Sequence, residues 1–188
     1  MSKKEIILNT ALNLFATKGY DAVGVQEIVD KSGITKPTLY HYFENKRGLL
    51  KAIIGEYFAN MHIAVYKASI YNGDISKTLT DTVTTFFSYA SKNHQFFRLK
   101  MGMWFAPKDS EPSKIIQPYL ELEQKVIEDI FINASKDHGN MLGREKAYAS
   151  SFLGIINTYI GIALKGYAKL DNELVHKLVH QFMHGIFS

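Results

Sequence analysis

Helical spacing of apolar residues runs through almost the whole chain, and this pattern restricts the fold more than any other feature. Between Leu8 and Phe15 the apolar residues fall at i, i+3, i+4 and i+7, which puts them on one face of an α-helix. No segment shows the sustained alternation of a half-buried strand. Residues 81–90, DTVTTFFSYA, are rich in β-branched side chains, but their length and flanks favour a helix. We therefore expect an all-α protein.

Glycine, proline and polar residues divide this pattern into about nine helices. Gly19 and Gly33 end the first two helices, because a residue without a Cβ tolerates the left-handed conformation of a C-terminal cap. Thr35 can cap the third helix, and Pro37 suits its first turn, where a missing N–H breaks no helical bond. The expected helices span residues 3–18, 25–31, 36–43, 46–71, 75–92, 93–105, 113–136, 144–168 and 172–187.

Composition narrows the class of protein. The 188 residues are 46% apolar, which is enough for a core in one domain or in a small domain joined to a larger one. The absence of cysteine excludes disulfides, cysteine nucleophiles and thiolate zinc sites, and fits a cytoplasmic protein. The most apolar window, 152–164, is shorter than the roughly 20 residues of a membrane helix, so we expect a buried helix and no membrane partner. The net charge of +4 indicates only a mild attraction to nucleic acids.

The first three expected helices have the spacing of a helix-turn-helix. Two short helices are joined by KSGIT, with a glycine in the turn, and a longer helix precedes them. Leu39 and Phe43 are one turn apart on the second short helix and are expected to join Phe15, Ile28 and Ile34 in a small core. The opposite side of that helix can then enter a DNA groove.

The side chains on this opposite side suit DNA. Hydroxyls and a lysine can contact phosphates, a proline or threonine methyl can contact thymine, and histidine can donate to base edges. If the aromatic residues only filled the core, Tyr40 and His41 would be exposed without a role. The residues concerned are Lys36, Pro37, Thr38, Tyr40 and His41.

Residues 14–50, LFATKGYDAVGVQEIVDKSGITKPTLYHYFENKRGLL, resemble the DNA-binding region of the tetracycline-repressor (TetR) family of transcription regulators. The resemblance rests on Phe15, Gly19, Tyr20, Ile28, Gly33, Leu39, Tyr40, Phe43, Lys46 and Leu49. It implies phosphate contacts by Tyr40 and Lys46, and positions nearest to bases for Gln26, Lys36, Pro37 and His41, with Thr38 also at the DNA. One departure is Val23-Gly24, because many members carry threonine or serine ahead of the second helix.

The resemblance also implies the organisation of the rest of the chain. Residues 1–47 would be the helix-turn-helix DNA-binding domain, and residues 48–188 a larger helical domain that binds a ligand and dimerises through its last two helices. Small residues recur every seven positions at Ala147, Gly154, Gly161 and Ala168, a seam that lets another backbone approach closely. A helix crossing in a homodimer is the preferred interpretation of this seam, and a groove for a ligand is the alternative. An apolar stripe in the last helix would complete a four-helix interface; it comprises Val175, Leu178, Val179, Phe182, Met183 and Ile186.

A concentration of aromatic residues and methionines at 86–105 suggests either a core or the lining of an apolar ligand pocket. Two polar residues of a neighbouring helix would add contacts to an inducer of unknown identity and charge. The candidate ligand-binding residues are Phe86, Tyr89, Phe97, Met101, Trp104, Phe105, Asn157 and Tyr159.

No chemistry beyond binding is indicated. His176, His180 and His184 have a spacing that can hold a metal, but surface or interface histidines explain them better. We expect no metal site, no cofactor and no catalytic residue, because no phosphate-binding glycine loop, metalloprotease motif or nucleophile elbow occurs. The expected function is a ligand-responsive repressor, released from a palindromic DNA operator by a small-molecule inducer. The alternative is a DNA-binding adaptor that acts through a protein partner without an inducer.

Overall fold

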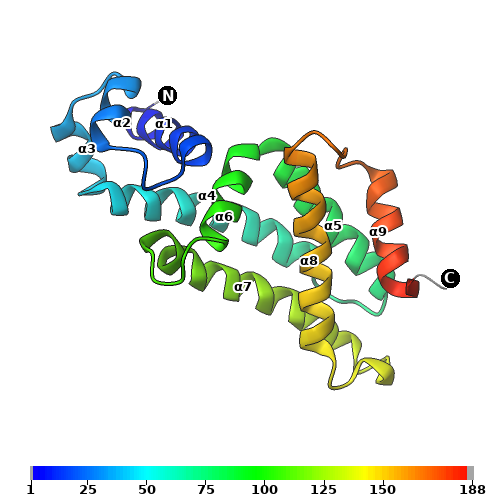
Figure 1. The fold of residues 1–188 in the computed structure, drawn as a ribbon. Helices are drawn as coiled ribbons and strands as arrows, with labels where there is room; N and C mark the ends of the chain where they lie inside the picture. Colours follow the sequence, from blue (N-terminus) through cyan, green and yellow to red (C-terminus); the bar gives the residue numbers. More distant parts are fainter. Residues whose placement is uncertain (1, 186–188) are drawn as a thin grey trace. The chain divides into compact units, whose positions relative to one another are not determined.

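The computed structural model describes residues 2–185, which form nine α-helices, one short 3₁₀ helix and no strand (Figure 1). The prediction of an all-α protein is therefore confirmed for this part of the chain. The elements are α1 (Lys3–Lys18), α2 (Val25–Ser32), α3 (Lys36–Phe43), α4 (Lys46–Ala68), α5 (Ile75–Lys92), α6 (His94–Trp104), α7 (Glu111–Ala134), η1 (Gly139–Met141), α8 (Glu145–Leu164) and α9 (Asn172–His184).

By packing, the chain forms two compact units. Unit 1 comprises the residues up to Ala59 together with Asn93–Pro118, and unit 2 comprises Asn60–Lys92 together with the residues from Tyr119 onward. Helices α4 and α7 each continue from one unit into the other. Unit 1 therefore contains α6 as well as the three N-terminal helices. The predicted division into a DNA-binding domain, 1–47, and a ligand-binding domain, 48–188, concerns function rather than packing. It stays a prediction.

Unit 1 is built around α1, which packs against α2, α3 and α6. A capping box begins α1: the Ser2 hydroxyl accepts from the Glu5 backbone N–H at 3.2 Å, and the Glu5 carboxylate accepts from the Ser2 N–H at 2.8 Å. The helix ends at Gly19, whose φ of 84° suits a residue without a Cβ. This anchored helix provides the apolar face on which α2 and α3 pack.

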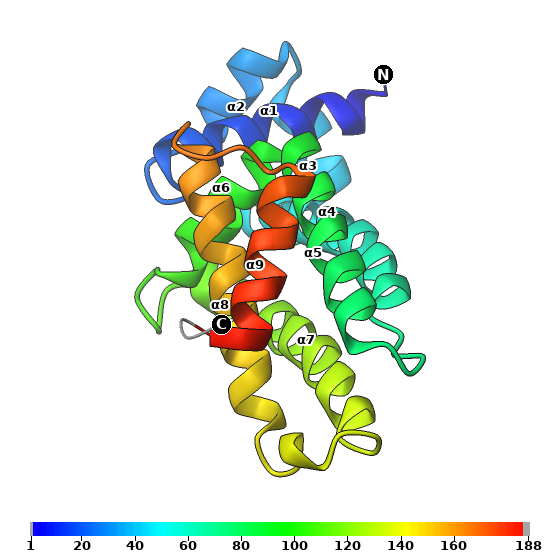
Figure 2. The ribbon, with the colours of Figure 1, turned by 90° about the vertical axis from the view of Figure 1, so that its right-hand side faces the viewer.

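Unit 2 is built around α5, which packs against α8 and α9. Figure 2 shows α9 running alongside α5. The α9 residues Val175, Leu178 and Val179 are buried within the chain. This part of the α9 stripe is therefore used inside the chain, which corrects its prediction as a contact between subunits. Ile186, the last member of the predicted stripe, lies outside the described residues.

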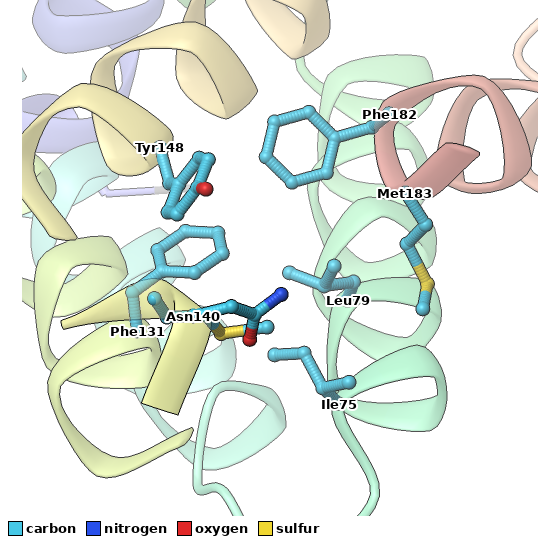
Figure 3. A pocket seen from close by; sticks show the side chains of 8 residues that line it. Ile75, Leu79, Phe131, Asn140, Tyr148, Phe182 and Met183 are labelled. Atoms are coloured by element: carbon cyan, nitrogen blue, oxygen red, sulfur yellow. The ribbon is translucent and has the colours of Figure 1, made fainter. Parts of the chain in front are cut away.

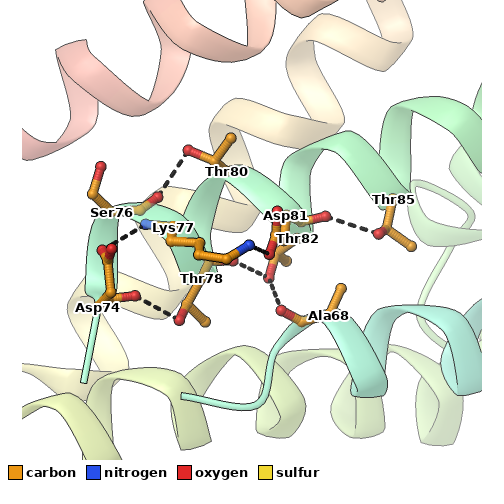
Figure 4. A network of polar contacts seen from close by, with 9 residues as sticks. All are labelled: Ala68, Asp74, Ser76, Lys77, Thr78, Thr80, Asp81, Thr82 and Thr85. Atoms are coloured by element: carbon orange, nitrogen blue, oxygen red, sulfur yellow. Dashed lines mark hydrogen bonds and ion pairs between the residues drawn. The ribbon is translucent and has the colours of Figure 1, made fainter. Parts of the chain in front are cut away.

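The threonine-rich segment 81–90 is helical, as predicted, and Figure 4 shows how its threonines are accommodated. The Thr82 hydroxyl donates to the Thr78 carbonyl at 2.7 Å, and the Thr85 hydroxyl donates to the Asp81 carbonyl at 2.8 Å (Figure 4). The Asp74 carboxylate caps the start of α5 by accepting a hydrogen bond from the Lys77 backbone N–H at 2.9 Å. Bonding back to the preceding turn satisfies the Thr82 and Thr85 hydroxyls inside the helix, so these β-branched residues need no strand.

Helix α8 ends earlier than predicted. The Tyr167 N–H donates to the Ile162 carbonyl at 3.1 Å and the Gly166 N–H to the Ala163 carbonyl at 2.9 Å, the pattern of a Schellman cap. Gly166 provides the positive φ, 82°, that this cap requires. Ala168 therefore lies beyond the helix, and the predicted seam of small residues keeps only three members on α8.

Helix α8 extends beyond its most apolar window, residues 152–164. It has 20 residues, and within the described residues it is the one helix long and apolar enough to cross a membrane, by length and composition only. The prediction concerned only the window 152–164, and the whole helix reaches the length of a membrane span. Its buried side chains, including Phe152, Ile156 and Ile160, lie on one face, and only 33% of the apolar window is buried. Outside this face, Ile155 and Leu164 are half-buried and Ile162 is exposed.

The turn between α3 and α4 depends on a close approach of two backbones. The Asn45 side chain accepts from the Gly48 N–H at 2.8 Å, which satisfies a free donor in the first turn of α4. A Cβ built on Gly48 would lie 2.1 Å from the Phe43 carbonyl oxygen. Only glycine fits this position without a shift of the backbone.

We predict that Gly48→Ala destabilises the protein by about 2 kcal/mol, because the new methyl group overlaps a backbone oxygen and the turn must distort. The measurement is urea unfolding followed by circular dichroism. Gly102→Ala is the matched control, since the same methyl group on this exposed helical glycine meets nothing within 4 Å. It is expected to stabilise α6 by up to about 1 kcal/mol. Equal effects of the two substitutions would contradict the steric account.

Candidate nucleic-acid interface and ligand cavities

Helices α2 and α3 are joined by a tight turn with defined caps. Gly33 ends α2 in the left-handed conformation, with φ 66° and ψ 27°. The Thr35 hydroxyl then accepts from the Thr38 backbone N–H at 3.4 Å and lies 3.0 Å from the Thr38 hydroxyl. Gly24 precedes α2 without a side-chain cap, in keeping with the departure noted at Val23-Gly24. The turn fixes the angle at which α3 leaves α2.

Burial fixes the rotation of α3 about its axis. Leu39 is 0% exposed and Phe43 is 5% exposed, so both face the core of unit 1 as predicted. Tyr40 is 42% exposed, and His41 lies exposed beside it. The His41 ring packs edge-on against Tyr42, with 5.2 Å between ring centroids. Tyr40 and His41 therefore present polar edges to solvent rather than filling the core.

The other predicted DNA contacts of this helix lie at its start. Lys36 and Pro37 are exposed, and Thr38 is half-buried through its contact with Thr35. Five of the seven predicted residues thus come from α3 and share its outward side. Their contact with DNA stays a prediction.

The charges around α3 favour an anion. On α2, Glu27 pairs with Lys18 at 2.6 Å and with Lys31 at 3.3 Å, which lowers the pKa of the Glu27 carboxyl and offsets both lysines. Lys36 has no ion-pair partner within residues 2–185, and the first turn of α3 contains no acidic residue. The positive end of the helix dipole therefore adds to the lysine charge. The lysine charge and the helix dipole thus both favour an anion at the start of α3.

Gln26 and Lys46, the predicted DNA contacts outside α3, are both engaged within the protein. The Gln26 amide donates to the Asp30 carboxylate at 2.7 Å along the exposed side of α2. The Lys46 ammonium donates to the backbone carbonyls of Tyr20 and Val23, each at 3.0 Å, and lies 4.1 Å from the centroid of the Tyr20 ring. An ammonium has three donors, so one remains for a phosphate. The resemblance implied a DNA contact for Lys46, which stays a prediction, but it did not indicate that Lys46 holds the α1–α2 loop.

A second anchor of the same loop was missed by the sequence analysis. The Tyr20 hydroxyl donates to the Glu111 carboxylate at the start of α7, and Arg47 Nε lies 3.4 Å from the other oxygen of that carboxylate. We call Tyr20, Arg47 and Glu111 the Glu111 clamp. Burial and the Glu111 hydrogen bond raise the pKa of the Tyr20 phenol. Tyr20 and Glu111 are 91 positions apart, and no local pattern links them.

The eight predicted ligand-binding residues do not form one group within either unit. Phe97 and Phe86 are buried, in unit 1 and unit 2 respectively, whereas Phe105 is 82% exposed and stacks on Trp104 with 5.3 Å between centroids. Four of the eight belong to unit 1: Phe97, Met101, Trp104 and Phe105. The other four belong to unit 2: Phe86, Tyr89, Asn157 and Tyr159. Their role in binding an inducer stays a prediction.

Each unit has a cavity that the sequence did not indicate. Unit 1 contains an open cavity of about 390 Å³ between the end of α1, the α1–α2 loop and α6, lined among others by Phe15, Leu99 and Met103. Unit 2 contains a cavity of about 130 Å³, shown in Figure 3. Its lining comprises Ile75, Leu79, Phe131, Asn140, Met141, Tyr148, Phe182 and Met183. Neither cavity is lined by any of the eight predicted ligand-binding residues.

The three histidines of α9 form a row on its exposed side. The ring centroids of His176 and His180 are 6.2 Å apart, and those of His180 and His184 are 4.6 Å apart. Within residues 2–185, no group of three or more potential ligands is arranged to hold a metal ion. The three rings are tilted against one another in a row on the surface of α9.

We predict that Tyr20→Phe lowers the free energy of unfolding by about 1 kcal/mol at pH 7, through loss of the hydrogen bond to Glu111. The folded phenol has a raised pKa, whereas the unfolded phenol ionises near pH 10, so this contribution is complete below about pH 10 and is lost as the pH rises further. The difference between the wild type and the variant should therefore shrink above pH 10 in urea unfolding experiments. Tyr167→Phe, at an exposed position, should change nothing. A difference that is constant with pH would refute the assignment.

Comparison with known proteins identifies the N-terminal region. Residues 7–53 match the family described as bacterial regulatory proteins, tetR family. The transcriptional activator FasR of Mycolicibacterium smegmatis is 27% identical over 154 residues, which cover 79% of this chain and 66% of that protein. The chain thus spans about two thirds of the length of this relative.

Two solved structures share the fold over nearly the whole chain. The fatty acid degradation regulator FadR of Bacillus halodurans is 17% identical, with a TM-score of 0.82 over 99% of this chain and 97% of that one. FadR of Bacillus subtilis, solved in complex with stearoyl-CoA, is also 17% identical, with a TM-score of 0.82 over 97% of this chain and 98% of that one. Together with the helix-turn-helix of α2 and α3, the match over residues 7–53 places the N-terminal region in the tetR family of bacterial regulatory proteins, and the two solved structures show the fold of the whole chain.

Proposed function

We propose that this regulator is a homodimeric repressor that binds a palindromic operator through α3 and is released by a small-molecule inducer. The observation that carries the proposal is the outward side of α3. It presents Lys36, Pro37, Tyr40 and His41 to solvent, while Leu39 and Phe43 hold the helix in the core. A lysine, a phenol and an imidazole on one exposed helix side fit the phosphates and base edges of a major groove.

The geometry of a two-fold dimer sets the form of the operator. Two copies of α3 related by a two-fold axis meet successive major grooves, so half-sites should lie about 34 Å apart, or a multiple of that distance. The operator is then a palindrome. Binding should take place in the bacterial cytoplasm, where the DNA is.

The proposed dimer uses the last two helices, with α8 as the main contact. One third of the residues in the apolar window of α8 are buried, several others are half-buried, and Ile162 is exposed. Gly154 and Gly161 lie half-buried on the same helix, where small side chains allow a second backbone to approach. Uncovered apolar surface with small residues on a core helix favours association with a second copy.

The proposed inducer acts by shifting a conformational equilibrium. A ligand releases DNA only if it binds the DNA-incompetent state more tightly than the competent one, and DNA must then weaken ligand binding to the same extent. The stearoyl-CoA complex of the B. subtilis FadR supports a ligand-responsive role for this fold. The eight residues predicted from the sequence, from Phe86 to Tyr159, stay the proposed candidates for contacts with an inducer.

We predict that His41→Ala changes the sequence preference of DNA binding, because the imidazole is proposed to read a base edge. One base contact corresponds to about 1–3 kcal/mol of discrimination, so affinity for the operator should fall by roughly tenfold while affinity for random duplex stays the same. Fluorescence anisotropy with both duplexes measures the two affinities. His94→Ala, at an exposed histidine of α6, is the matched control and should change neither. Equal losses on operator and random DNA would exclude base reading by His41.

We predict a solution mass of twice 21.3 kDa by light scattering at micromolar concentration. Ile162→Glu should raise the dimer dissociation constant at least tenfold, because it places an unpaired carboxylate in the proposed interface. Ile132→Glu, the same change at an exposed position of α7, is the control and should leave the dimer intact. A monomeric wild-type protein, or equal effects of both substitutions, would contradict an interface through α8.

A further inference from the structure

The cavity of unit 2 has the size of a single aromatic ring. Its volume of about 130 Å³ is close to that of an engineered cavity of about 150 Å³ that binds benzene. Its walls come from five elements, α5, α7, η1, α8 and α9, so no single helix forms it. It is therefore a site of the tertiary structure rather than a gap beside one helix.

The inner wall of the cavity is apolar and aromatic. Leu79 and Phe131 are each 1% exposed and close its inner end. The Phe131 ring centroid lies 5.7 Å from that of Tyr148 and 5.9 Å from that of Phe182. Figure 3 shows Tyr148 and Phe131 across the space from Leu79 and Ile75, with Phe182 above Leu79. A flat ring between them gains edge-to-face contacts that an aliphatic molecule of the same size lacks.

The outer part of the cavity carries its polar groups and two thioethers. Asn140 and Met183 are exposed, and Met141 is half-buried. Figure 3 shows the Asn140 carboxamide between Phe131 and the side chains of Ile75 and Leu79. This carboxamide can both donate to and accept from a hydroxyl of a ligand. The thioethers of Met141 and Met183 add favourable contacts with the edge of an aromatic ring.

The residues that line the cavity favour an uncharged ligand. None of its eight residues is an acid, a lysine, an arginine or a histidine. A charged group inside the cavity would lose its hydration without gaining a counter-ion, which costs several kcal/mol. Anions and cations of suitable size are therefore disfavoured.

From this lining we propose that the cavity of unit 2 is a second ligand site, which takes a neutral single-ring aromatic molecule with one hydroxyl-type group directed at Asn140. The site shares no residue with the eight positions proposed for the inducer. Binding here needs neither DNA nor the inducer, and only a regulatory effect of this binding on DNA affinity would rest on the proposed function.

The chain provides its own reporters for the test. Of its six methionines, Met141 and Met183 line the cavity, whereas Met61, Met101 and Met103 do not. In protein labelled with ¹³C at the methionine methyl groups, phenol should produce saturable shifts of the Met141 and Met183 signals through its ring current. The signals of Met61, Met101 and Met103 should stay in place. The titration needs no DNA, so its failure is distinguishable from failure of the repressor proposal.

Three probes and one variant separate the parts of the proposal. Cyclohexanol has the same size and hydroxyl without the ring and should bind at least threefold more weakly than phenol, and benzoate, which is charged, should give no saturable shift. Asn140→Ala should weaken phenol about fivefold, the value of one hydrogen bond, and leave toluene unchanged. Shifts that fail to saturate, equal shifts at all five methionines, or benzoate binding as tightly as phenol would each overturn the proposal.

Discussion

The burial of Leu39 and Phe43 is the constraint on which the DNA-binding surface depends. These two side chains are one turn apart, so seating both in the core of unit 1 leaves a single rotation of α3. That rotation turns Tyr40 and His41 outward. Gly33 lies in the turn before α3 and supports the same orientation of this helix. Its left-handed conformation directs the chain into α3 at a fixed angle. Packing in the core of unit 1 thus determines which side of α3 faces outward.

The α1–α2 loop is held by charged groups at two points. Lys46, at the start of α4, donates to two of its carbonyls, and Glu111, at the start of α7, accepts from the Tyr20 hydroxyl. Both anchors lie in unit 1, so the helix-turn-helix is fixed to the first turns of α4 and α7 as well as to α1. The Glu111 clamp connects the loop before the helix-turn-helix to a helix that continues into unit 2. A change at the start of α7 would therefore act directly on the loop.

The sequence predicted what depends on local chemistry. The limits of α1 and α3 follow from caps and glycines within a few residues of their ends, and the inward side of α3 follows from the spacing of Leu39 and Phe43. The end of α8 was missed, although Gly166 was visible, because the apolar pattern continued past it. The Glu111 clamp and the cavity of unit 2 could not be predicted, since each joins residues far apart in the chain. The assignment of Val175, Leu178 and Val179 to a subunit contact failed because a stripe does not reveal which neighbour covers it.

The most direct test of the central claim is the affinity of the purified protein for duplexes from the DNA that flanks its own gene, measured by fluorescence anisotropy at low ionic strength. The account predicts that at least one such duplex binds more tightly than a shuffled duplex of the same composition. It also predicts that this preference persists when salt is raised and non-specific binding falls. Equal binding to the flanking and shuffled duplexes, or no binding to either, would contradict the role assigned to α3.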